Sequence, residues 1–184
     1  VDASQLPASE PYGVVVSTHE RELTEPVDLC TPDGERLNPD ALGWSRRPLH
    51  RANLTGQHGR NKRWDYWAVL AGDVLVSTVV ADVDALALGD LWWAHVPSGR
   101  TGGGGTIAPA GTVAIPDRCG TASFGLSGGG VDLSYEEHDG GTRLLARWAE
   151  ADGREGALDV LVALPPDHES LNVVIPWDDT TFNF

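Results

Sequence analysis

Methionine is absent from the chain, even at position 1, and lysine occurs once, as Lys62 beside twelve arginines. The absence of an initiator methionine indicates a processed chain or an excised segment. Cysteine occurs only at Cys30 and Cys119, too few for a disulfide framework or a cysteine metal site. We therefore expect two free thiols in a cytoplasmic protein.

Long apolar runs are also missing. No stretch approaches the roughly 20 apolar residues that a transmembrane helix needs, so we expect no membrane span. Residues 1–10 lack the basic start and the apolar stretch of a signal peptide. Hydrophobic residues still make up 41% of the 184 residues, which is enough to form the core of one domain.

Positive charge is scarce and unevenly placed. The chain has 13 Lys and Arg against 27 Asp and Glu, a net charge of −14, which argues against binding to nucleic acid. Residues 36–63, the basic block, nevertheless carry seven bases and one acid. We expect much of this block to be an ordered crossing loop or short irregular strands, and its arginines to pair with carboxylates such as Asp65, Asp82 and Asp84.

The 22 glycines and 12 prolines argue against a helix bundle and for a turn-rich β protein. From residue 63 onward, β-branched and apolar segments alternate with turn sequences, among which 138–141 (HDGG) is a hairpin signal. The glycine-rich stretch 98–106 predicts a flexible loop. Strands are predicted at 63–70, 74–83, 91–96, 112–115, 122–126, 131–137, 142–150, 157–164 and 171–175.

This pattern predicts an all-β fold, an antiparallel meander that closes into a lipocalin-like barrel or sandwich, because open sheet edges aggregate. Residues 1–43 are interpreted as an irregular N-terminal extension, with a short strand at 12–17 and a helical turn after Asn38. Residues 44–184 are interpreted as the barrel-like domain. The apolar tail from residue 177 resembles the start of another strand, so we expect the natural protein to continue.

Side chains that alternate along the strand at 63–70 place Arg63, Asp65 and Trp67 on one face. If that face is inward, desolvation raises the pKa of Asp65, and a neutral acid there could protonate an alkene or enol. The bland alternative, which we favour, is a plain ion pair with Arg63. His50, set among arginines, is the second candidate for proton transfer.

Other polar groups offer weaker signals. Asp82 and Asp84 share a strand face and could bind a cation, although a solvated strand end is the simpler interpretation. The six histidines lack metal-ligand spacing and no nucleophile motif occurs, so we expect no metal and no cofactor. The candidate ligand-binding residues, from the basic block and the Trp-rich strands, are Ser45, Arg47, His50, Asn53, Arg63, Trp67, Asp82 and Trp92.

Three segments carry a family resemblance: LTEPVDL (23–29), GWSRRPLHRANL (43–54) and GRNKRWDYW (59–67). In them the chain resembles the bacterial and fungal domain of unknown function 2804 family, clearly over 21–95 and loosely to the end. The resemblance implies double lipocalin-like barrels, an architecture similar to carotenoid hydratases and tocopherol cyclases. Family members look about twice as long, which implies that this chain is an N-terminal half. The resemblance carries no activity.

Three functions compete on this basis. The first is a lipocalin-like domain that binds an apolar or amphipathic small molecule in a Trp-lined β cavity. The second is a hydratase-, cyclase- or isomerase-type enzyme that uses Asp65 or His50 for proton transfer, and the sequence leaves open whether the chain is an enzyme. The third is a structural half-domain that packs on a missing C-terminal half and exposes a large apolar patch.

Overall fold

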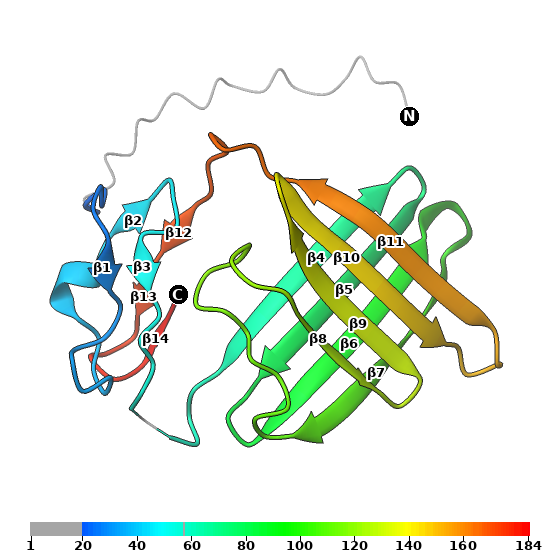
Figure 1. Ribbon diagram of the computed structural model, residues 1–184, viewed down its shortest axis with the longest axis horizontal. Helices are drawn as coiled ribbons and strands as arrows, with labels where there is room; N and C mark the ends of the chain where they lie inside the picture. The colour runs from blue at the N-terminus through cyan, green and yellow to red at the C-terminus, as the bar shows by residue number, and fades with distance from the viewer. Residues whose placement is uncertain (1–19, 57) are drawn as a thin grey trace, which may run out of the picture.

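A computed structural model describes residues 20–56 and 58–184, which form a β-sandwich and a smaller terminal module (Figure 1). The terminal module consists of residues 21–56 and 170–184, so it combines segments from both ends of the described chain. Eight strands build the sandwich: β4 (Arg63–Ala71), β5 (Val74–Asp82), β6 (Leu86–His95), β7 (Arg100–Pro109), β8 (Phe124–Gly128), β9 (Val131–His138), β10 (Gly141–Ala149) and β11 (Glu155–Ala163).

The sandwich consists of two four-stranded antiparallel meanders. One sheet has the order β4-β5-β6-β7 and the other β11-β10-β9-β8, so every strand pairs with its neighbour in sequence. The predicted all-β antiparallel fold is confirmed. Of the two predicted closures, the described residues form the sandwich and no closed barrel.

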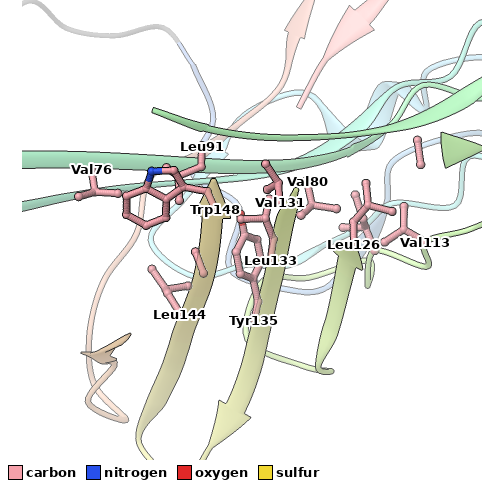
Figure 2. Packing of buried hydrophobic residues seen from close by; sticks show 13 residues of the cluster. Val76, Val80, Leu91, Val113, Leu126, Val131, Leu133, Tyr135, Leu144 and Trp148 are labelled. Carbon is pink, nitrogen blue, oxygen red and sulfur yellow. The ribbon is translucent and has the colours of Figure 1, made fainter. Parts of the chain in front are cut away.

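The core lies between the two sheets. Leu91 and Val80 from one sheet meet Leu133, Tyr135 and Leu144 from the other, and each is at most 1% exposed (Figure 2). Each buried apolar side chain of this size contributes roughly 1.5–3 kcal/mol to folding. This facing core is why two separate meanders form one unit.

At one end of the sandwich a single carboxylate joins the two sheets. Glu150, which follows β10, accepts hydrogen bonds from the indole N–H groups of Trp93 on β6 (2.6 Å) and Trp148 on β10 (2.8 Å). It also accepts one from the backbone N–H of Gly103 on β7 (3.2 Å). These donors stabilise the carboxylate and lower the pKa of Glu150 from its usual value.

Short strands and a second core build the terminal module. β1 (Val27–Asp28) pairs in parallel with β3 (His50–Arg51), β2 (Trp44–Ser45) pairs with β12 (Asn172–Val173), and β13 (Ile175–Pro176) pairs with β14 (Phe182–Asn183). The predicted helical turn is present as a 3-10 helix, Pro39–Ala41, capped by the Asn38 side chain. The buried residues of this core are Leu29, Cys30, Leu37, Ala41, Ala52 and Val174.

Two predictions of local structure are wrong. Residues 98–106, expected as a flexible loop, mostly belong to β7, because they pair with β6. Glycine fits there since a side chain at Gly102 would meet Glu150 and one at Gly104 would meet Val131. Residues 112–115, expected as a strand, form none, and instead Val113 and Ile115 insert buried side chains into or beside the core. The strand expected at 12–17 lies outside the described residues.

Candidate functional site

An open cavity of about 770 Å³ lies where the terminal module meets the start of β4 and the loop 115–119. This volume is within the range of small-molecule sites, roughly 300–1,000 Å³. The aromatic residues that line it are Trp64, Tyr66, Trp177, Phe182 and Phe184. The charged residues that line it are Arg60, Lys62, Arg63, Asp65 and Asp117.

Arg63 holds three segments of the cavity wall together. Its Nη1 donates to the backbone oxygen of Ile115 (3.0 Å) and its Nη2 to that of Ala52 (3.0 Å). Nη1 also lies 2.8 Å from the Asp117 carboxylate. The guanidinium therefore pairs with Asp117 rather than with Asp65, and it fixes β4, the chain after β3 and the loop 115–119 relative to one another.

Asp65 lies on the inward face of β4, as the alternation predicts, and is half-buried. Burial is the main cause that raises the pKa of Asp65, and the nearby Glu137 carboxylate raises it further. The indole N–H of Trp67 and the Cys119 thiol favour the ionised form and oppose this rise. The Trp67 N–H is buried and approaches the carboxylate without the full geometry of a hydrogen bond.

Both cysteines are free thiols. Cys119 is exposed as a residue, yet its thiol faces Asp65, and burial of the sulfur together with the charges of Asp65 and Glu137 raises its pKa to about 12. Burial is also the main cause that raises the pKa of Cys30 in the terminal module. A protonated thiol is a poor nucleophile, so this environment disfavours Cys119 as a nucleophile.

Asp82 and Asp84 form hydrogen bonds that position the loop beside the cavity wall. Asp84, with a φ of +70°, accepts hydrogen bonds from the backbone N–H groups of Gly59 (2.5 Å) and Asn61 (3.2 Å). Asp82 accepts one from the Asp84 backbone N–H (2.9 Å). Asp84 thus anchors the loop 59–61, and within 20–56 and 58–184 neither carboxylate forms an ion pair with the basic block. Within 20–56 and 58–184 no group of three His, Cys, Asp or Glu residues is placed to hold a metal.

The arginines of the basic block pair with other carboxylates than those expected. Arg46 contacts Glu22 (3.3 Å) and Glu169 (3.1 Å), and Arg51 contacts Asp28 (2.6 Å). These pairs are more than two-fifths exposed on both partners, so each contributes little to stability.

Three of the predicted ligand-binding residues hold the terminal module together, and a fourth, Arg47, joins it to the segment before residue 170. Ser45 is fully buried and donates to the Arg47 backbone oxygen (2.7 Å), and Arg47 reaches the Pro166 oxygen (3.4 Å). Asn53 bonds both the N–H and the oxygen of Cys30. His50 is fully buried, its Nε2 lies 2.9 Å from the Ala41 oxygen, and its ring packs on Phe184.

The structure therefore brings together only part of the predicted set. Arg63 and Asp65 line the cavity, Trp67 lies behind them in the sandwich, and Trp92 lies on the outer face of β6, 41% exposed. Sequence reasoning missed the opposite wall, which Trp177 and Phe184 supply. Their signal was the aromatic content of the last eight residues, which we interpreted as the start of a further strand.

The sheet topology defines the class of protein. It is a two-sheet antiparallel β-sandwich, and one end of the sandwich meets a module built from both ends of the described chain. A family model, Domain of unknown function (DUF2804), matches residues 20–184, and the chain belongs to this family. No curated protein and no solved structure matches. No helix among the described residues is long and apolar enough to cross a membrane.

Proposed function

We propose that this domain binds an apolar or amphipathic small molecule in the cavity beside β4. The observation that carries the proposal is the lining itself: five aromatic side chains surround about 770 Å³. Aromatic walls with a few polar groups are typical of sites for flat or chain-like organic ligands. The site lies between the sandwich and the terminal module, which distinguishes it from the lumen of a lipocalin barrel.

The test is a pair of tryptophan variants. Trp177→Ala removes an aromatic wall of the cavity, whereas Trp92→Ala removes an exposed tryptophan from the outer sheet face. We expect native lipids extracted with the wild-type protein and identified by mass spectrometry to be retained by Trp92→Ala and lost from Trp177→Ala. Equal retention by the two variants, or retention of nothing by the wild type, would contradict the proposal.

A second candidate function is proton-transfer catalysis in the same cavity. It is supported by Asp65, because a carboxyl group with a raised pKa that faces a cavity can act as a general acid toward an alkene or enol. His50 is absent from the lining and has a weaker claim. Turnover in D2O would place deuterium in the product, and Asp65→Asn would keep the ligand and abolish that incorporation.

A third candidate is a half-domain that packs on a C-terminal half of the same protein. It is supported by the outer face of the β4–β7 sheet, where Trp64, Tyr66, Leu70, Trp92 and Ile107 are each at least 41% exposed. A shallow hollow of about 560 Å³ lies on this face, and Trp64 and Ile107 are among the residues that line it. If this face is an interface, Leu70→Lys will reduce self-association of the purified chain in sedimentation experiments without lowering its melting temperature.

A further inference from the structure

The cavity wall differs in charge from the rest of the molecule. The chain carries a net charge of −14, yet three bases and two acids line the cavity. Arg63 and Asp117 already neutralise each other. The remaining charged groups are Arg60, Lys62 and Asp65, so the wall has an excess of positive charge in an acidic protein.

Arg60 and Lys62 have no ionic partner in the part of the chain that the structure describes. No side-chain hydrogen bond or ion pair joins either of them to residues 20–56 or 58–184. Acids outnumber bases about twofold in this chain, 27 to 13, so the two cations lie in an acidic protein without a carboxylate of their own among the described residues. Arg46 and Arg51 of the same basic block do pair with carboxylates.

The loop that carries these two cations is fixed in place. Asp84 accepts hydrogen bonds from the backbone on either side of Arg60, at Gly59 and Asn61. The Asn61 side chain donates to the Gly56 oxygen (2.7 Å). The backbone is thus positioned before any ligand arrives, which lowers the entropic cost of binding.

We propose that the ligand is an anionic amphiphile, whose negatively charged head group lies at Arg60 and Lys62 and whose apolar part lies against the aromatic wall. This inference rests on the proposed function, because it assigns a chemical class to the ligand of the same cavity. Arg60 and Lys62 attract an anion. Asp117 does not neutralise them, because it already pairs with Arg63. Trp64 and Tyr66 lie two and four residues after Lys62, at the start of β4, so the charged and apolar contacts lie close together.

The experiment compares three probes that share one tail: decanoate, decan-1-ol and decyltrimethylammonium, each titrated calorimetrically into the purified chain. We expect decanoate to bind about tenfold more tightly than decan-1-ol, because each partly solvated charge contact contributes roughly a few-fold in affinity. Decyltrimethylammonium should bind most weakly at this site. Added salt should weaken decanoate binding and leave decan-1-ol binding nearly unchanged.

Variants assign the effect to the two cations. Arg60→Gln with Lys62→Gln should remove the roughly tenfold preference for decanoate over decan-1-ol. Arg100→Gln, an exposed arginine on β7 outside the cavity, is the matched control and should keep the preference. A thermal melt of each variant verifies that it folds.

The outcomes distinguish an error in the anionic class of the ligand from an error in the proposed binding to the cavity. If decanoate and decan-1-ol bind equally well to the wild type, or if the double variant keeps the preference, the anionic class is wrong while cavity binding stands. If neither probe binds, the proposed function and this inference are both overturned.

Discussion

Replacing Arg63 with methionine tests whether this residue joins the cavity wall. The methionine keeps most of the aliphatic stem and removes two hydrogen bonds to backbone oxygens, both 3.0 Å, and the ion pair with Asp117. A hydrogen bond from a charged donor contributes about 1.5–3 kcal/mol when its acceptor is shielded from water. The acceptors at Ile115 and Ala52 are in partly buried settings, so we take the lower end of that range.

The Asp117 side chain is 60% exposed, so its ion pair adds less than about 1 kcal/mol. The expected loss for Arg63→Met is therefore roughly 3–4 kcal/mol in the free energy of unfolding. Asp117→Asn, which removes only the ion pair, should lose about 1 kcal/mol or less.

Urea unfolding followed by tryptophan fluorescence measures these losses. Arg100→Met is the matched control, because Arg100 is exposed and its side chain forms no hydrogen bond or ion pair with the described residues, and it should stay within about 0.5 kcal/mol of the wild type. If Arg63→Met also stays within that margin, the guanidinium does not hold the wall together. If Asp117→Asn loses as much as Arg63→Met, the ion pair and not the backbone contacts carries the effect.

Three more variants test the interior. Burial raises the pKa of Asp65, so the ionised carboxylate destabilises the fold and Asp65→Asn should be the more stable protein at neutral pH. As pH falls through the raised pKa, the wild type should gain stability relative to the variant. The difference should vanish near the ordinary Asp value, about pH 4, in urea melts. Glu150→Gln should behave in the opposite way, because its pKa is lowered: the variant should be less stable at neutral pH, with the gap closing in acid. Tyr135→Phe should cost about 1–3 kcal/mol, because it leaves the buried Thr78 hydroxyl unpaired, and adding Thr78→Val should restore most of that loss. A larger loss in the double variant than in Tyr135→Phe would contradict this account.

The hairpins of the sandwich were predictable because their determinants are local. Along β4 the alternation of Arg63, Asp65 and Trp67 with exposed residues gives the buried face directly. The turn glycines Gly72 and Gly140 have positive φ angles, 60° and 84°, which the turn sequences predict.

β7 was not predictable from its own sequence. A run of four glycines normally indicates a flexible loop, because glycine has the most backbone freedom to lose. In the structure these glycines form strand pairs with β6, and the space beside them is filled from elsewhere. Glu150 lies against Gly102 and Val131 against Gly104, and both partners are at least 27 residues away in sequence.

The role of the polar residues in the basic block was also not predictable, because it depends on contacts between segments far apart in the sequence. Ser45 and Asn53 were expected to contact a ligand, but both bond to backbone groups inside the terminal module. Strands of two residues leave many backbone groups without sheet partners, and side chains must satisfy them. Spacing alone cannot distinguish a polar group that faces a ligand from one that completes irregular backbone.

The two ends of the sandwich differ in what their carboxyl groups do for the fold. Glu150 has its ionised form stabilised by three donors, so at neutral pH it strengthens the contact between the two sheets. Asp65 at the open end has its ionised form disfavoured by burial, so at neutral pH it weakens the fold. An asparagine of nearly the same shape would avoid that cost, which means that packing does not explain the carboxyl group. A group that lowers stability and faces a cavity is typical of a functional site, and this supports the proposal that the start of β4 contributes to the function of the domain.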